Sequence, residues 1–485
     1  MPKFTIPSGA VRSFRSQHTR WAGERPGFTE VTRPGALRVG GNEGQWHSWP
    51  GGVSRTPVYR MGCALEWRIP GEERDYLREL ARKQARYAAL PVMEQRRRMW
   101  YDLNDGRPGA RPPVIVETWT FDRDFMPPGV FRCTSKDGRE VEQQLLRNVR
   151  NHELIDDDKV IPDAFTMGWI VDVDYLGVKI GSESVKDSQG VNTGYRYLHP
   201  IKDLRGDLGK LRPAACRVDR DRTMARKAFL EELFDGALPV RLSGRPLGNT
   251  FLTNTVVALM GMEAFFTSMY DCPDHVHRLM AFLRDNALGA MGWAEGEGLL
   301  SLNNGNQDSF GSSYNFTTRL PAEGFDGKHV RLRDLWGSAN SQETVGISPA
   351  MFHEFCFPYY RDVVEPLGLV YYGCCEPAHP FWDDISRLPH LKKVSISRWC
   401  DEPFMGEALR GTEIVYSRKP DPNLLGVDVK LNEEAWTACI RRTLQAARGC
   451  FIEFIVRDVY TVHGDLSKPR RAVQLARAEI SRHYG

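Results

Sequence analysis

The chain has 485 residues, 41% of them hydrophobic, and a net charge of +3. This length suits one large domain with insertions, and the hydrophobic fraction is sufficient for an extensive core. The near balance of acidic and basic residues argues against a nucleic-acid-binding protein, which would carry a concentrated basic face. No run of about 18 apolar residues occurs, so we expect no membrane span.

The ten cysteines are scattered and do not form the dense framework of a small secreted domain. The N-terminus also lacks the apolar core of a signal peptide. We therefore expect a cytoplasmic protein whose thiols are free, bound to metal, or buried as small hydrophobic groups.

Residues 1–70 are rich in Gly, Pro, Ser and Arg and show no hydrophobic periodicity. This composition favours an irregular N-terminal arm, which could pack on a partner subunit. A helical pattern begins at Glu72 and is interrupted at Pro91. The first apolar strand of the expected main domain, residues 71–485, follows at 113–117 and ends on Glu117.

The middle of the chain is mixed. We expect a strand at 170–175, a helix at 223–234 and a second helix from Asp271, with Pro273 in its first turn. The apolar residues 299–302 precede a polar loop at 303–308, and a second polar loop containing Gln342 follows Trp336. Polar clusters after apolar strands suit substrate hydrogen bonds, although they are also ordinary turn chemistry.

The last third alternates regularly between strands and helices. A helix capped by Ser348 leads to a strand at 369–372, and further strands are expected at 394–397, 413–416 and 451–456, each followed by a helix. Strict alternation predicts a parallel sheet of the α/β class. With this length, a (β/α)₈ barrel of the TIM type is favoured over a doubly wound sheet, and no glycine-rich dinucleotide motif follows any strand.

Active sites of such barrels lie at the carboxyl ends of the strands, where this chain carries thiols and carboxylates. Their convergence predicts a zinc site. The alternative is that the cysteines are small buried residues beside tight turns. Because successive strand residues point to opposite faces, only one of Cys374 and Cys375 is expected to be a ligand. The expected ligands are Cys374, Cys400, Asp401 and Asp458.

The same strand ends supply candidates for proton transfer and substrate binding. Acidic or imidazole groups would manage protons, aromatic rings would wall an aromatic substrate, and arginines would hold a carboxylate or phosphate. Solvent exposure of the histidine and ordinary ion pairing of the arginines are the alternatives. The catalytic candidates are Glu117, Glu376, Asp458 and His463. The substrate-binding candidates are Trp119, Trp336, Gln342, Tyr372 or its neighbour Tyr371, Arg418 with the adjacent Lys419, and Arg457.

Several strings resemble the uroporphyrinogen decarboxylase-like superfamily over residues 70–485. They are Arg-Pro-Pro-Val at 111–114, Asp-Leu-Trp-Gly at 334–337, Ser-Pro-x-x-Phe at 348–352 and Gly-Cys-Cys-Glu at 373–376. The strings Tyr-Gly-Cys-Cys-Glu-Pro at 372–377 and Ser-Arg-Lys-Pro-Asp-Pro at 417–422 resemble a bacterial branch related to the cobalamin-dependent methyltransferases.

The resemblance implies one of two chemistries. Decarboxylases of the superfamily use no metal and hold their substrate with an arginine-rich loop after the first strand, where this chain has Glu117. Related cobalamin-linked methyltransferases bind zinc through a His-x-Cys strand and a Cys on the last strand. Here the His is replaced by Tyr372, Cys374 is present, and Asp458 falls near the final Cys. The resemblance therefore implies that Cys374 is the ligand and that Cys375 is its neighbour.

Our leading hypothesis is a metal-dependent methyltransferase that demethylates a small O-, N- or S-methylated substrate. Zinc would polarise the departing heteroatom, and the methyl group would pass to cobalamin carried by a separate corrinoid protein. The resemblance also suggests a homodimer. Two alternatives remain: a decarboxylase or other lyase that acts on a small organic acid without cobalamin, and a non-catalytic binding protein on a barrel scaffold.

Overall fold

The computed structural model describes residues 67–186, 192–307 and 312–484, so the expected N-terminal arm lies outside it except for 67–70. Six parallel strands form the central sheet in the order β1-β12-β11-β10-β9-β8. The α/β class is therefore confirmed. The strands are β1 (Val114–Val116), β8 (Trp336–Ala339), β9 (Leu369–Tyr372), β10 (Leu391–Ile396), β11 (Val415–Arg418) and β12 (Phe451–Val456).

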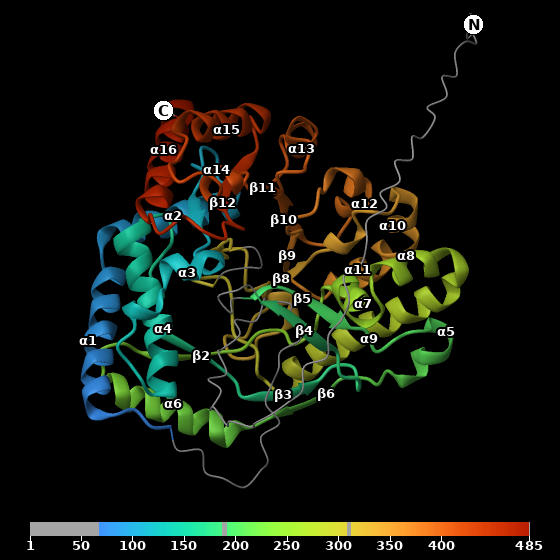
Figure 1. The fold of residues 1–485 in the computed structure, drawn as a ribbon, viewed down its shortest axis with the longest axis horizontal. Coiled ribbons are helices and arrows are strands. Elements are labelled where there is room, and N and C mark those ends of the chain that lie inside the picture. The colour runs from blue at the N-terminus through green and yellow to red at the C-terminus, as the bar shows by residue number, and fades with distance from the viewer. Residues whose placement is uncertain (1–66, 187–191, 308–311, 485) are drawn as a thin grey trace, which may run out of the picture. The chain divides into compact units, whose positions relative to one another are not determined.

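Sixteen α-helices accompany the strands in the part of the chain that is described (Figure 1). They are α1 (Gly71–Ala88), α2 (Pro91–Asn104), α3 (Asp122–Phe125), α4 (Lys136–Arg150), α5 (Leu204–Asp207), α6 (Arg220–Phe234), α7 (Leu252–Met260), α8 (Met262–Asp271), α9 (Pro273–Gly296), α10 (Pro349–Phe355), α11 (Phe357–Val364), α12 (Trp382–Ile385), α13 (Glu402–Leu409), α14 (Asn423–Gly426), α15 (Glu433–Ala446) and α16 (Ser467–Tyr484). None of them is both long enough and apolar enough to cross a membrane.

The alternation expected for the last third is present. Helices separate β8 from β9, β9 from β10, β10 from β11 and β11 from β12. The hydroxyl of Ser348 accepts the backbone N–H of Met351 at 3.2 Å, which confirms the predicted N-cap of α10. The single helix expected after Ser348 is divided at Cys356 into α10 and α11, because Pro358 cannot continue a hydrogen-bonded helix through that point.

Smaller strand pairs occupy the middle of the chain. β2 (Phe165–Gly168) pairs in parallel with β7 (Val240–Ser243). The expected strand at 170–175 is observed as β3 (Val171–Asp174), but it pairs antiparallel with β6 (Ala215–Val218) outside the central sheet. β4 (Gly181–Lys186) and β5 (Asn192–Leu198) form another antiparallel pair. The expected strand at 299–302 is not assigned, although Ser301 donates its N–H to the Gly244 carbonyl.

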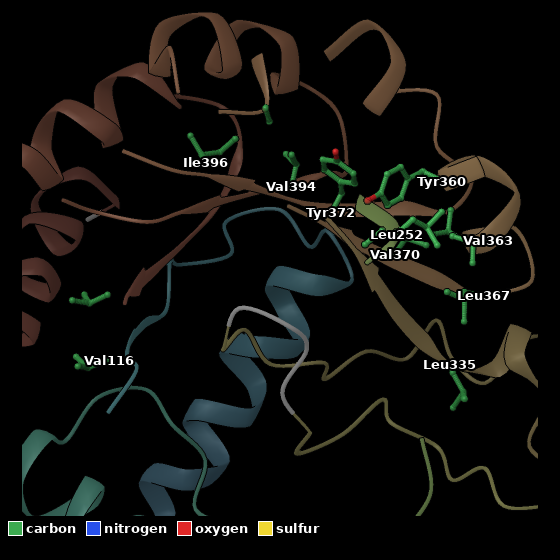
Figure 2. Packing of buried hydrophobic residues seen from close by; sticks show 14 of the residues in the cluster. Val116, Leu252, Leu335, Tyr360, Val363, Leu367, Val370, Tyr372, Val394 and Ile396 are labelled. Carbon is green, nitrogen blue, oxygen red and sulfur yellow. The ribbon is translucent and has the colours of Figure 1, made fainter. Parts of the chain in front are cut away.

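The two faces of the central sheet differ. Val394 and Ile396 of β10 point toward the outer helices, where they join the main hydrophobic cluster (Figure 2). Tyr372 of β9 lies on this same apolar side with Tyr360 of α11 (Figure 2). Burying this face against helices supplies most of the core, whereas the opposite face carries the polar groups described below.

Side chains cover the two edge strands of the sheet, β1 and β8. The carboxylates of Asp157 and Asp158 accept the backbone N–H groups of Val116 and Val114 at 2.8 and 2.7 Å. At β8, the amide of Asn303 bonds both the N–H and the carbonyl of Trp336. These bonds replace the backbone partners that a further strand would give.

Replacing Asp157 tests this edge. Asp157→Ala leaves the buried N–H of Val116 unpaired, and we expect it to lower the free energy of unfolding by about 1–3 kcal/mol. Asp163→Asn, which alters an exposed pair with Arg241, should change it by less than about 0.5 kcal/mol. Urea denaturation measures both values, and equal effects would contradict the role given to Asp157.

Candidate active site

A buried ion pair occupies the inner face of the sheet, opposite the outer helices. Nζ of Lys393 on β10 lies 3.1 Å from Oε2 of Glu453 on β12, and both side chains are fully buried. Lys393 also donates to the Ser313 hydroxyl at 2.6 Å and to the Tyr314 carbonyl at 3.1 Å. Sequence reasoning missed this pair, although a charged residue inside each apolar strand was its signal.

Burial disfavours the charged form of both partners. It lowers the pKa of Lys393, and Glu453 opposes that change. Burial would raise the pKa of Glu453, but the cations Lys393 and Lys419, together with hydrogen bonds from the Ser417 and Ser313 hydroxyls, outweigh this effect and lower it. Glu453 is therefore held as a carboxylate between two lysines.

The ion pair should be strongly coupled. We expect Lys393→Met and Glu453→Leu each to destabilise the fold by about 3–5 kcal/mol, because each leaves one buried charge without its partner. The double variant should lose much less than the sum of the two. Unfolding free energies of the four proteins give this coupling, and additive losses would contradict a direct pair.

A second lysine lies at the carboxyl end of β11. Nζ of Lys419 donates hydrogen bonds to the hydroxyl of Tyr371, to Oγ of Ser417 at 2.5 Å and to the Ser417 carbonyl at 3.3 Å. Tyr371 belongs to β9, so these bonds cross the inner face of the sheet. The Lys419 ammonium can therefore share a proton with the Tyr371 hydroxyl.

The electrostatic setting of Lys419 differs from that of a surface lysine. Burial lowers its pKa to about 7. The carboxylate of Glu453 opposes this shift, while the cations Arg457 and Lys393 add to it. At neutral pH the Lys419 ammonium can therefore both lose and regain a proton.

The Cys-Cys-Glu cluster forms a tight turn after β9. Gly373 has φ +95°, a conformation that suits glycine, and a Cβ there would meet Cβ of Ser395 at 3.0 Å. The buried carboxylate of Glu376 accepts the N–H groups of Cys374 and Ser341 at 2.9 and 3.1 Å. Burial raises the pKa of Glu376. This expected catalytic residue therefore anchors the turn that carries the cysteines.

The two cysteines place sulfur beside the end of β12. Their Sγ atoms lie 3.4 Å apart, and the Cys375 thiol donates to Oδ2 of Asp458 at 3.1 Å. The hydrogen bond to Cys374, together with burial, raises the pKa of Cys375. Cys375 is accordingly a protonated thiol at neutral pH. It is also the partly accessible member of the pair, because Cys374 is fully buried.

Arg457 and two carboxylates complete the cluster. Nη2 of Arg457 lies 3.7 Å from Oε2 of Glu117, and its Nε lies 3.5 Å from Oδ2 of Asp458. The hydroxyl of Ser312 donates to Glu117 at 2.6 Å. Burial raises the pKa of Glu117 despite the nearby arginine. Asp458 has φ +60°, an uncommon conformation outside glycine, and such strained residues gather at functional sites.

Two of the four expected metal ligands, Cys400 and Asp401, are engaged in other hydrogen bonds. The thiol of Cys400 accepts the Ala378 N–H at 3.3 Å, and Asp401 caps α13 through Phe404 at 2.9 Å. The described residues contain no group of three or more His, Cys, Asp and Glu side chains that could hold a metal ion. The residues present therefore do not fit the expected zinc site, and we derive no chemistry through zinc.

Three other candidates also lie apart from the cluster. Arg418 faces the outer helices, where it pairs with Glu402 of α13 at 2.6 Å. Tyr372 also faces that side and bonds the Ser341 hydroxyl at 2.6 Å. His463 is exposed on a loop and contacts the carbonyls of residues 426 and 427. Arg418 and Tyr372 point away from the cluster because side chains alternate along a strand. Their neighbours Lys419 and Tyr371 lie on the inner face instead.

The aromatic and amide candidates have mixed positions. Trp119 follows the first strand and is half-buried, with a hydrogen bond to the Glu117 carboxyl. Gln342 is half-buried in a 3₁₀ turn after β8. Trp336 is buried, and its ring centroid lies 5.6 Å from Nζ of Lys393.

A cavity of about 600 Å³ adjoins Trp336. It is lined by the loop after β7, by residues 303–307 and by part of β8. Oδ1 of Asn315 lies in its wall without a hydrogen-bond partner among the described residues. This volume suits a small organic ligand.

Comparison with models of known protein families gave no match, and neither did comparison with curated proteins. Among solved structures, the chain is similar to a methyltransferase from Methanosarcina mazei. The two are 14% identical with a TM-score of 0.46, and the match covers 80% of this chain and 99% of that one. At this level of similarity, nothing about activity follows for this chain.

Proposed function

We propose that the protein is an enzyme that removes a methyl group from a small O-, N- or S-methylated molecule, with the reaction at the carboxyl ends of β9, β11, β12 and β1. In this proposal β2, β7 and residues 299–303 complete a barrel with the central sheet. The strings that resemble the cobalamin-dependent methyltransferase branch support the reaction class. The reactive groups at the strand ends support the location.

The observation that carries the proposal is the buried Lys419, hydrogen-bonded to the Tyr371 hydroxyl on the inner face. When the methyl carbon leaves, its bond to the heteroatom breaks and the electron pair stays on that heteroatom. A proton from the Lys419 ammonium would neutralise it. The Tyr371 hydroxyl would share that proton, so this step uses only groups of the chain.

The methyl group requires an acceptor. A corrinoid carried by a partner protein would supply the nucleophile that receives it. The residues of this chain would orient the methylated substrate and protonate the atom that departs. In this proposal Lys419 takes the role that zinc was expected to fill.

Decarboxylation is the second candidate, because the buried Lys419 beside the Tyr371 hydroxyl could serve that reaction as well. In this reaction a carbon–carbon bond breaks, carbon dioxide leaves, and the electron pair on the remaining carbon takes a proton. Lys419 would donate that proton as well, without a corrinoid.

A substrate panel separates the two. The full-length protein is incubated with methoxy-, methylamino- and methylthio-benzenes and their acids, with and without reduced cobalamin, and products are followed by mass spectrometry. Demethylated product that depends on cobalamin is the expected result. Carbon dioxide released without cobalamin would establish the second candidate, and no product from any compound under either condition would contradict both.

The pH profile tests the role of Lys419. As a general acid, its ammonium is lost when pH rises through about 7, so kcat/KM should fall above that pH. Lys419→Met should lower kcat/KM by about 10²–10⁴-fold and abolish this alkaline limb of the pH profile, the fall in kcat/KM above about pH 7. Lys392→Met removes another buried lysine, whose ammonium donates to the Glu413 carbonyl at the amino end of β11. This control should keep the limb, whereas a limb that survives in Lys419→Met would refute the assignment.

A further inference from the structure

Two arginines end neighbouring strands and differ sharply in their partners. Arg418 and Arg457 are each only 3% exposed. Arg418 donates to the carbonyls of Ile396 and Ser397, to Thr443 and to Glu402, so its fork is fully engaged. Nε and Nη1 of Arg457 are buried and have no hydrogen-bond partner among the described residues.

Unpartnered N–H groups of a buried guanidinium need an explanation, because leaving a charged donor unsatisfied is costly. The carboxylates near Arg457 do not supply one. They stand 3.5 and 3.7 Å away, beyond good hydrogen-bond distance. Each also accepts a shorter bond from another side chain: Glu117 from Ser312 and Asp458 from Cys375.

We infer that Arg457 binds a carboxylate group of the substrate and thereby selects small methylated carboxylic acids. That the bound acid is a methylated substrate rests on the proposed function, whereas the binding of a carboxylate does not. Two N–H groups of a planar guanidinium match the two oxygens of a carboxylate in a bidentate pair.

The surrounding charges favour a carboxylate over a phosphate. Glu117 and Asp458 already face Arg457, so each added negative charge is repelled. A carboxylate adds one charge, whereas a phosphate at neutral pH adds nearly two. Burial also raises the pKa of Glu117, so this group can take up a proton when the substrate anion enters and relieve the repulsion.

Cys375 adjoins the proposed anion site. Its thiol bonds the same Asp458 oxygen that faces Nε of Arg457. A carboxylate held by Arg457 would therefore lie beside this sulfur atom.

Binding is measured by calorimetry on the full-length protein, with 4-methoxybenzoate as the probe, 4-methoxybenzamide as its uncharged counterpart and inorganic phosphate as a competitor. The wild type should bind the acid at least about tenfold more tightly than the amide. Arg457→Met should erase this preference, and Arg457→Lys should retain part of it, because a lysine keeps the charge but loses the fork. Unchanged melting temperatures show that the variants are folded.

Thermal unfolding gives a second measurement, because a ligand that binds the folded protein raises its melting temperature. The acid should raise the melting temperature of the wild type but not that of Arg457→Met. Equal binding of acid and amide, a preference that persists in Arg457→Met, or stronger displacement by phosphate than by a second carboxylate would overturn the inference. No methyl acceptor is present in these measurements, so they test the binding alone. Selective binding of the acid, together with no product in the substrate panel with cobalamin, would count against the proposed function and leave this inference standing.

Discussion

The fold places charged side chains on the inner face of a parallel sheet whose other face is mainly apolar. The Lys393–Glu453 ion pair stabilises this arrangement, because each partner compensates the buried charge of the other. Buried charges are expensive, and apolar residues of similar size would often stabilise a protein more than an ion pair does. Stability alone therefore gives no reason to keep Lys393 and Glu453 here. The field they create provides one, because Glu453 also faces Lys419, the proposed proton donor.

The inner face thus carries a row of charged side chains along the strand direction. Lys393 and Glu453 lie within β10 and β12, Lys419 lies at the end of β11, and Arg457 follows β12. Arg457 and Lys393 both help to keep the pKa of Lys419 low. The same setting that makes Lys419 a proton donor also makes Arg457 a site for an anion, so substrate binding and proton transfer depend on one electrostatic arrangement.

Much of the fold in the last third follows from the sequence, because short apolar runs alternate with capped helices. The convergence of Cys374, Glu117, Arg457 and Asp458 follows as well, since carboxyl ends of parallel strands share one edge. The facing of individual strand residues could not be obtained this way. A strand buried on both faces is an almost continuous apolar run without alternation, so nothing separated Arg418 from Lys419 or Tyr372 from Tyr371. The antiparallel pairing in the middle region could not be predicted either. Of its four strands, only β3 was expected from the sequence.

The metal expectation shows the limit of residue types as a guide. Cys400 and Asp401 have the right chemistry and the right position in the chain. However, the Cys400 thiol accepts a backbone N–H, and the Asp401 carboxylate caps the N-terminus of α13. Residue type shows what a side chain can bind, whereas local hydrogen bonds decide what it does bind.

The central claim is that Arg457 and Lys419 act on one substrate at this edge of the sheet. A crystal structure of the full-length protein with 4-methoxybenzoate tests it most directly. We expect the carboxylate within hydrogen-bond distance of Nε or Nη1 of Arg457 and the methoxy oxygen facing Nζ of Lys419. A ligand bound instead in the cavity beside Trp336, with Arg457 unoccupied, would contradict the account.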